Sequence, residues 1–324
     1  MPSRLAAFAG GLLVLAATSV APAQDASRPI RMVIAFPPGG PTDFVGRLVA
    51  DKAKDLLGQP IIIENKPGAN GAIGADYVAK SPPDGSTLFL TTLGAVGVTP
   101  HMRTDVRYDP IKDFAPITQV VLNTTLIVVR AESPFNSAKD LTAAAKAKPG
   151  EITFASTGVG SNTHLAMELY QGSAGIKFVH VPYRGAAPAL TDLLGGTVQV
   201  FSADAAALMT QIKGGKIKAL AAASGRRNPM LPDVATLAEQ GYPDTTVDNW
   251  YGLLAPAGTP PATLARIHDA FVGAINDPVV KEKLIQSGAI PVANSAAEFG
   301  RFLKEEYDRW GKIVREKGIK DDQR

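Results

Sequence analysis

Cysteine is absent from the chain, and its absence excludes several classes of protein. Without cysteine there is no disulfide framework, no thiolate metal site and no lipid-anchored cysteine. Stability must therefore come from an apolar core. The chain has 324 residues, 45% of them apolar, and is long enough to form two domains of ordinary size.

Charge of a single sign is also scarce. The chain has 33 basic and 30 acidic residues, a formal net charge of +3, and no long run of either sign. Such a small excess gives no reason to predict binding to nucleic acid or to an anionic membrane surface.

Apolar runs long enough to cross a membrane are missing beyond the N-terminus. At the N-terminus, Arg4 precedes "LAAFAGGLLVLAATSVA", which leads into Ala21-Pro22-Ala23. A membrane anchor is one interpretation of this run. Its glycine and alanine content and its A-x-A end instead favour a signal peptide, residues 1–23, that is removed on export. We therefore expect the protein to work outside the cytoplasmic membrane, in a periplasm.

Short strand-like runs alternate with helix-like segments through most of the remaining chain. "IRMVIAF", "PIIIEN", "STLFLTT", "EITFAS" and "KFVHVPY" are strand candidates, and each is followed by a helical or loop pattern. Repeated units of this kind predict an α/β fold with mainly parallel sheets and helices on both faces.

Two long extended segments, near residues 120–129 and 218–224, predict a discontinuous architecture. One lobe would combine residues 24–123 and 225–324, the other would hold residues 124–224, and the two crossings would form a hinge. Loops at the carboxyl ends of the strands would then face each other across a cleft, where ligands of open α/β sheets bind.

The loop "FPPGGPTDF" ends the first predicted strand and opens a helix, with Thr42 as the expected N-cap and Gly58 as the stop. Gly39 and Gly40 would let the backbone approach a ligand, and the helix N-terminus would favour an anion. Simple helix capping explains this loop alone equally well.

A second loop of the same design lies in the other predicted lobe. In "FASTGVGSNTHLAMEL", a strand is followed by Ser156, Thr157, Gly158 and Ser161, and then by a helix. A carboxylate fits these two loops better than a phosphate, because neither contains a basic residue and no Walker or dinucleotide pattern is present.

Two further positions have a binding and a structural interpretation each. Tyr183, Arg184 and Gly185 lie between a strand and a helix, where Arg184 either pairs with a carboxylate or marks an exposed helix start. Asp204 follows "TVQVFSA" and either accepts from a ligand amine or hydroxyl or caps the next helix.

Signatures of catalysis and of metal binding are weak. The chain has no G-x-S-x-G elbow, and its four histidines form no H-x-x-x-H pair, so no catalytic residue, metal or cofactor is predicted. His164, beside the second loop, is expected either to touch the ligand or to support the loop. A hydrolase would require His164 to reach Ser156 or Ser161 and an acid to support it.

Several stretches together resemble one family, the substrate-binding proteins of tripartite tricarboxylate transporters, also called the Bug (Bordetella uptake gene) family. They cover nearly the whole chain after the N-terminal run: "RPIRMVIAFPPGGPTDFVGRLVADKAKDLLGQPIIIENKPGANGAIGADYVAKSPPDGSTLFL", "YDPIKDFAPIT", "FASTGVGSNTHLAMEL", "VPYRGAAPALTDLLGG", "GGKIKALAAAS" and "NWYGLLAPAGTP".

The resemblance implies a type II periplasmic binding protein fold, in which two lobes close over a small organic acid. Many members carry an aspartate at the position that is Ala203 here, with Asp204 beside it. The ligand-binding residues expected from the loops and the resemblance are Pro38, Gly39, Gly40, Thr42, Asp43, Thr92, Ser156, Thr157, Gly158, Ser161, His164, Tyr183, Arg184, Gly185 and Asp204.

The predicted function is capture of an organic carboxylate for delivery to the permease subunits of a tripartite transporter. The acid would be a di- or tricarboxylate, an aromatic acid or an acidic amino acid. Two alternatives stay open from the sequence: a receptor that presents its liganded state to a membrane sensor, and an exported hydrolase on the same scaffold.

Overall fold

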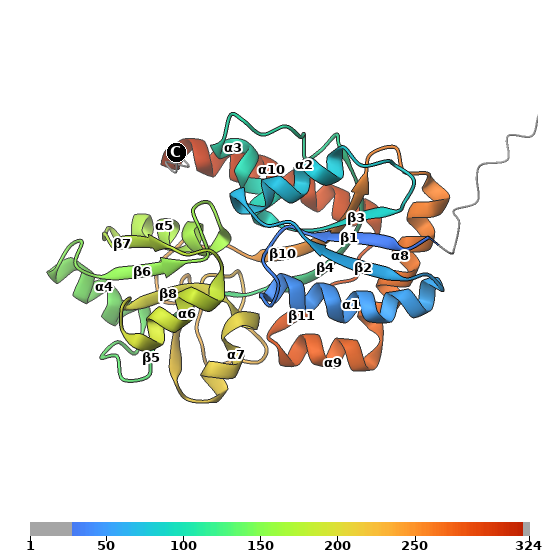
Figure 1. Cartoon of the computed structure of the whole chain (residues 1–324). Coiled ribbons are helices and arrows are strands. Elements are labelled where there is room, and N and C mark those ends of the chain that lie inside the picture. Colours follow the sequence, from blue (N-terminus) through green and yellow to red (C-terminus); the bar gives the residue numbers. More distant parts are fainter. Residues whose placement is uncertain (1–27, 320–324) are drawn as a thin grey trace, which may run out of the picture.

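The computed structural model describes residues 28–319, which form two α/β lobes, each built around one sheet (Figure 1). The predicted signal peptide, residues 1–23, lies outside the described residues. None of the helices in residues 28–319 combines the length and the apolar character that a membrane crossing requires.

The first lobe contains a six-stranded sheet in the order β11-β4-β10-β3-β1-β2. Its strands are β1 (Ile30–Ile34), β2 (Ile61–Asn65), β3 (Thr87–Thr92), β4 (Phe114–Asn123), β10 (Asn249–Pro256) and β11 (Ala289–Pro291). Its helices are α1 (Pro41–Leu57), α2 (Ala72–Ala79), α3 (Thr99–Met102), α8 (Pro261–Asn276), α9 (Pro278–Gln286) and α10 (Ala296–Lys317), with short turns at Ala69–Gly71 and Gly94–Val98.

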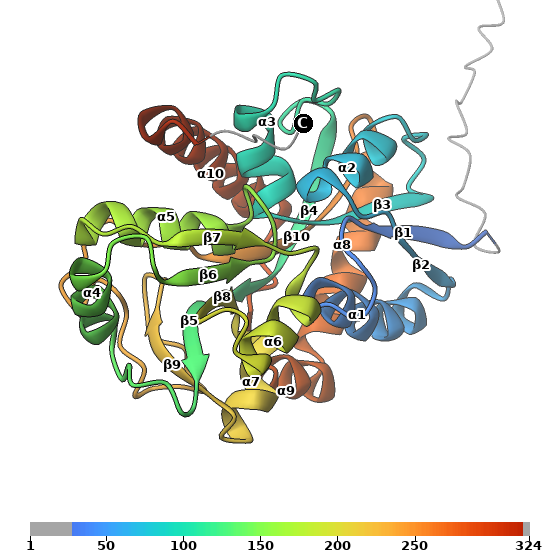
Figure 2. The same cartoon turned by 60° about the vertical axis from the view of Figure 1, so that its left-hand side comes forward.

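The second lobe contains a five-stranded sheet in the order β7-β6-β8-β5-β9. Its strands are β5 (Thr125–Arg130), β6 (Thr153–Ser156), β7 (Val179–Pro182), β8 (Val200–Asp204) and β9 (Ile217–Ala222). Its helices are α4 (Ala138–Ala147), α5 (Asn162–Ala174), α6 (Ala186–Gly195) and α7 (Ala205–Lys213), as Figure 2 shows from a second side.

Most strands of each sheet run in one direction, as expected, although each sheet also contains antiparallel pairs: β1 to β4 share one direction, and so do β6 to β9. β1 pairs in parallel with β2 and β3, and β6 with β7 and β8. The strands nearest the lobe junction run the other way: β10 is antiparallel to β3 and β4, and β5 to β8 and β9.

The first crossing between the lobes is short. β4 ends at Asn123 and β5 begins at Thr125, so the predicted single extended segment changes sheets at Thr124. The return differs from the prediction, because β9 occupies residues 217–222 within the second sheet. The chain then stays beside β9, where the Val247 amide donates to Ala223, and reaches the first sheet at β10. The lobe boundaries at residues 123/124 and 224/225 stay a prediction.

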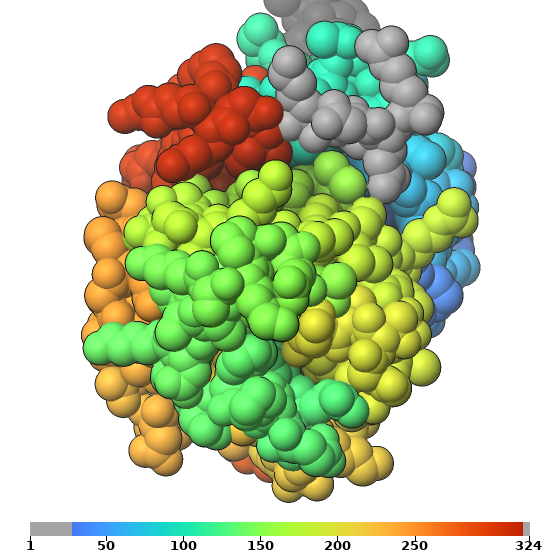
Figure 3. All heavy atoms as spheres, turned by 90° about the vertical axis from the view of Figure 1, so that its left-hand side faces the viewer, coloured from blue at the N-terminus to red at the C-terminus, as the bar shows by residue number. Residues whose placement is uncertain are grey.

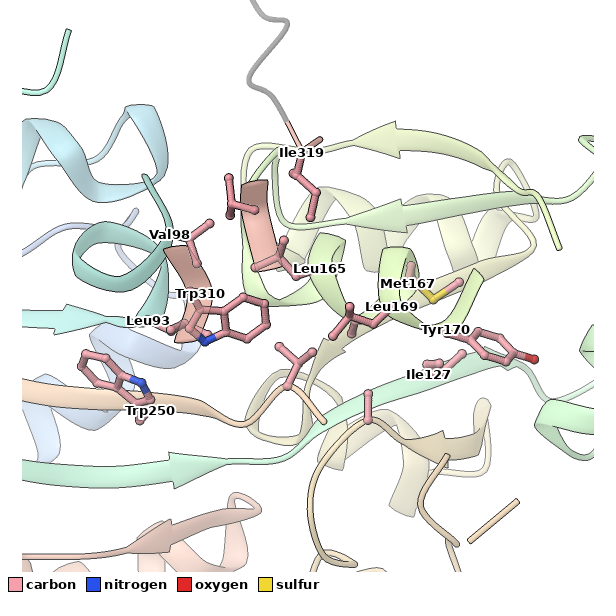
Figure 4. Close-up of a cluster of buried hydrophobic side chains, with 14 of the residues drawn as sticks. Leu93, Val98, Ile127, Leu165, Met167, Leu169, Tyr170, Trp250, Trp310 and Ile319 are labelled. Atoms are coloured by element: carbon pink, nitrogen blue, oxygen red, sulfur yellow. The ribbon is translucent and has the colours of Figure 1, made fainter. Parts of the chain in front are cut away.

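One apolar cluster passes through both lobes along the side that carries α10. Trp310 of α10 is completely buried, as are Leu93 and Trp250 of the first lobe and Leu165 and Ile127 of the second (Figure 4). The cluster therefore joins the two lobes by side-chain packing as well as by the crossing strands.

Helix α10 reaches the second lobe because it is long and well capped. Its 22 residues begin with a capping box, in which Ser295 and Glu298 exchange hydrogen bonds with each other's backbone. At its other end Lys317 approaches Gly172 of α5, and Ile319 packs into the shared cluster. Figure 3, which faces the second lobe, shows α10 in red along the upper margin of that lobe.

Candidate functional site

A cavity of about 940 Å³ opens between the lobes and is lined by loops and helix starts from both. Of the expected ligand-binding residues, twelve line it: Pro38, Gly39, Gly40, Thr42, Thr92, Thr157, Gly158, Ser161, Tyr183, Arg184, Gly185 and Asp204. Asp43, Ser156 and His164 do not line the cavity, although each lies directly behind a loop that does.

The first loop is held in shape by Asp43. Its carboxylate accepts hydrogen bonds from the Gly39 amide (2.9 Å), from Arg47 Nε (2.8 Å) and from Asn65 Nδ2 (2.9 Å). Burial acts to raise the pKa of Asp43, but these hydrogen bonds outweigh it and hold the pKa below its usual range. Gly39 has φ of +79°, a left-handed conformation that favours glycine.

Thr42 is not the N-cap of α1, as the sequence had predicted. The cap is Gly40, with Pro41 at the first helical position, which suits a residue without an N–H. The predicted stop at Gly58 is confirmed by its left-handed conformation and its bonds to the last turn. This shift puts Thr42 in the first turn, on the cavity wall.

The second loop is bonded mainly to itself. Ser161 Oγ accepts from the His164 amide and donates to the Gly158 carbonyl, and the Thr157 amide donates to Thr163 Oγ1. Ser156 Oγ accepts from the Gly158 amide at 3.2 Å. The loop is therefore a preformed wall that needs no ligand to keep its conformation.

Two stacked histidines support this loop from behind. The rings of His164 and His180 lie 4.2 Å apart and nearly parallel, with Phe154 stacked on His180. His164 Nδ1 accepts from the Gly160 amide, and His180 Nε2 lies 2.7 Å from Ser156 Oγ. Burial and the neighbouring His164 lower the pKa of His180 to about 4, so this ring is neutral at physiological pH.

This arrangement differs from the one that a hydrolase was expected to show. The histidine that reaches Ser156 is His180 and not His164, and the Ser156 hydroxyl is completely buried. His164 Nε2 faces Glu168 at 3.6 Å, and His164 Nδ1 accepts from the Gly160 amide. The histidines therefore support the loop from behind, through His164 Nδ1 to the Gly160 amide and His180 Nε2 to Ser156 Oγ.

The third loop brings Tyr183, Arg184 and Gly185 to the cavity rim. Tyr183 Oη donates to Asp192 at 2.6 Å, and burial together with this carboxylate raises the pKa of Tyr183 to about 12. Gly185 has φ of +101° and precedes the first residue of α6. Arg184 is exposed at the rim and forms no ion pair within residues 28–319.

Asp204 lies at the cavity floor, where the two lobes meet, and its side chain does not cap α7. It accepts from Asn162 Nδ2 (2.7 Å), Asn249 Nδ2 (2.7 Å) and Tyr251 Oη (3.0 Å). Burial raises the pKa of Asp204 to about 6 against the effect of these donors. Of the two interpretations of Asp204, the structure therefore supports the role in the cavity and not the capping of α7.

Four helices that begin at the cavity have no side-chain cap. They are α1, α2, α6 and α7, whose N-cap residues Gly40, Gly71, Gly185 and Asp204 all line the cavity. The first N–H groups of a helix have no acceptor within it, and the helix dipole makes this end positive. Capping does not follow position in general, because α5 also starts at the cavity and is capped by Ser161, whereas α8 starts away from it without a side-chain cap. The four uncapped starts place positive dipole ends at the cavity, which favours an anion there.

Sequence reasoning missed several residues of the cavity wall. Asn70, in a left-handed conformation, donates from the first lobe to the Gly160 carbonyl of the second at 2.9 Å. Asn249 and Tyr251 join Asp204 at the floor. A polar residue opening the strand that returns between lobes is the signal that could have indicated Asn249.

Comparison with known proteins gives a consistent result. The family model described as "Tripartite tricarboxylate transporter family receptor" matches residues 45–319. The chain is 35% identical over 321 residues to protein BugT of Bordetella pertussis, covering 98% of each chain.

Solved structures show the same similarity. A Rhodopseudomonas palustris protein with adipate has a TM-score of 0.86 and 32% identity, over 90% of this chain and 98% of the other. MatC from the same organism, with bound malate, has a TM-score of 0.82 and 32% identity, over 89% and 99%. The predicted two-lobe α/β fold of the type II class is thereby confirmed.

Proposed function

The chain belongs to the tripartite tricarboxylate transporter receptor family, and from this premise we propose that it binds a small organic carboxylate in the cavity between its lobes. The observation that carries the proposal is the set of four uncapped helix starts that open on this one cavity. Together they offer positive dipole ends to an anion, and the N–H donors come mainly from α1 and α6, because the first amides of α2 and α7 already donate to the Ala69 and Thr124 carbonyls.

The bound acids of two similar structures support the same ligand class. One R. palustris relative was solved with adipate and MatC with malate, both of them dicarboxylates. The cavity here, about 940 Å³, is large enough for acids of this size.

Binding would close the lobes and present the liganded form to the permease subunits of a tripartite transporter, in the periplasm after removal of residues 1–23. Rotation about the crossing strands is the expected motion, since few backbone segments connect the two sheets. We propose binding without catalysis, because Ser156 is buried and neither it nor His180 lines the cavity.

The proposal is tested by thermal unfolding of the purified protein against a panel of di- and tricarboxylates, aromatic acids and acidic amino acids. At least one acid should raise the unfolding temperature in a concentration-dependent manner. Stabilisation by a sugar or a metal cation, but by no acid, would refute the proposal.

A matched pair of substitutions tests whether the thermal stabilisation by an acid arises from binding in the cavity. Ala207 of α7 lines the cavity, whereas Ala143 of α4 is exposed elsewhere on the second lobe. Ala207→Trp should abolish the stabilisation by filling the cavity, and Ala143→Trp should retain it. Equal loss in both variants would show that the acid binds somewhere else.

A further inference from the structure

The side chain of Asn70 joins the two lobes by a direct hydrogen bond. Asn70 lies in the short turn Ala69–Gly71 of the first lobe, and Gly160 lies in the loop after β6 of the second. Asn70 Nδ2 donates to the Gly160 carbonyl at 2.9 Å and to Thr99 Oγ1 of its own lobe at 3.2 Å. The two protons of the Asn70 amide are therefore both used, one in each lobe.

The backbone at Asn70 has a conformation that few residues tolerate. Asn70 has φ of +50° and ψ of +36°, and the preceding Ala69 has φ of +48°. This left-handed region disfavours residues with a Cβ, and asparagine is among those that accept it most readily. Two successive left-handed residues other than glycine indicate that their surroundings enforce this conformation.

Two glycines leave the space that the Asn70 side chain occupies. A Cβ on Gly94 would lie 2.6 Å from Asn70 Oδ1, which is too close for a Cβ. A Cβ on Gly160 would lie 3.4 Å from Asn70 Nδ2 and 2.8 Å from the sulfur of Met102, a cavity-lining residue of the first lobe. A larger residue at either position would displace its neighbours, so the close approach of the lobes at this point depends on both glycines.

The acceptor of the bond is held in place by its own loop. The Gly160 amide donates to His164 Nδ1, and the His164 ring stacks on His180 with 4.2 Å between the centroids. His180 Nε2 in turn lies 2.7 Å from Ser156 Oγ. Because these contacts fix the Gly160 peptide within the second lobe, a rotation of one lobe against the other would break the bond from Asn70.

We propose that Asn70 is a positioning residue that holds the lobes closed before a ligand binds, by fixing the loop of residues 156–161 against the first lobe. This inference rests on the lobe closure of the proposed function and adds to it that the free protein already populates the closed arrangement. A ligand binds less tightly when its binding-competent form is rarely populated. The Asn70–Gly160 bond would therefore raise the affinity for any acid that the closed cavity accepts.

The absence of cysteine from the chain makes the test direct, because two introduced cysteines can carry spin labels at chosen positions. Lys80→Cys in the first lobe and Thr191→Cys in the second are suitable, since both residues are exposed and neither lines the cavity. Lys80 follows α2 and Thr191 lies in α6, two helices that start at the cavity, so opening of the lobes changes the separation of the labels. Double electron–electron resonance measures this separation in the ligand-free protein.

Two variants remove the donor. Asn70→Gly leaves the left-handed backbone accessible, and Asn70→Asp keeps the size of the side chain without its N–H groups. The labels in the native background should show mainly the separation of the structure described above. Each variant should lower the ratio of this population to a more open one by roughly two- to tenfold, as expected for one net hydrogen bond. Asp244→Gly makes a similar change at an exposed left-handed residue outside the cavity lining, and should leave the ratio unchanged.

The outcomes are separate from those for the proposed function. A native protein that shows mainly the open separation, a ratio that both Asn70 variants leave unchanged, or an equal loss in Asp244→Gly would overturn the role of Asn70. Because no ligand is present in this experiment, none of these results bears on carboxylate binding, which the thermal unfolding panel tests by itself.

Discussion

Replacing Asp43 by alanine tests whether the first cavity loop is held by a side chain behind it. The carboxylate takes three hydrogen bonds of 2.8–2.9 Å, from Gly39, Arg47 and Asn65. Hydrogen bonds to a charged group contribute about 1.5–3 kcal/mol each. The Arg47 side chain is 51% exposed, so its ion pair contributes under about 1 kcal/mol, and the freed Gly39 amide can bind water.

We therefore expect Asp43→Ala to lower the free energy of unfolding by about 2–4 kcal/mol. Arg47→Ala, which removes only the exposed partner, should cost under about 1 kcal/mol. Urea unfolding of the ligand-free protein, followed by circular dichroism, measures both. If the two variants lose the same stability, Asp43 does not hold the loop in the way described.

The difference in free energy of unfolding between the native protein and Asp43→Ala should depend on pH, and this dependence provides an independent check. The folded pKa of Asp43 lies below its ordinary value of 3.8, because its hydrogen bonds outweigh the effect of burial. The stabilisation is therefore complete above pH 3.8 and is lost as the pH falls through the folded pKa. A difference between native protein and Asp43→Ala that persists unchanged in stronger acid would refute this reasoning.

Three further predictions concern packing and the histidine stack. A Cβ on Gly252 would lie 2.1 Å from Phe299, so Gly252→Ala should cost about 3 kcal/mol, and clearly less in a Phe299→Leu background, as double-mutant urea titrations would show. Trp310→Ala should cost about 3–5 kcal/mol by leaving a cavity in the shared cluster; a thermal midpoint equal to that of the native protein would contradict this. Because burial and His164 depress the pKa of His180 from 6.5 to about 4, stability should fall as the pH is lowered from 6.5 toward 4, and that part of the fall should be missing in His180→Gln.

The fold followed from the sequence where the signals are local. Strands such as residues 30–34 and helices such as residues 41–57 have their own periodicity, punctuated by glycine and proline. The same local signals misplaced the N-cap of α1 at Thr42. A threonine is the better cap on average, but proline at position 41 fits the first helical position and moves the cap to Gly40.

The loops that line the cavity could be predicted from the sequence, but the hydrogen bonds that connect their residues could not. Gly39 and Gly158 were expected to donate to a ligand, and the structure bonds their amides to Asp43 and Ser156 instead. The remaining donors are the first turns of helices, which the first loop indicated for α1 alone. Whether a helix start keeps its donors free depends on the absence of a cap, and this requires coordinates.

Asp204 shows why long-range partners escape a sequence argument. Its choice between capping and facing the cavity depends on Asn249 and Tyr251, more than forty residues further along the chain. The polar residue that opens the returning strand, Asn249, could have been suspected of a role in the cavity, but nothing local pairs it or Tyr251 with Asp204. These residues reach Asp204 because the chain returns to the first lobe at β10. The sequence had predicted this return near residues 218–224, which is too early.

The apolar cluster around Trp310 affects how the protein can be divided. The second lobe looks like a separable domain, because it has its own sheet and only two crossings. Excised alone, however, it would expose Leu165 and its neighbours, which are buried against α10 and the first lobe. An apolar face of this kind promotes aggregation. Likewise, a chain truncated before α10 would uncover both lobes at once, so soluble fragments for binding studies need the C-terminal helix to be retained.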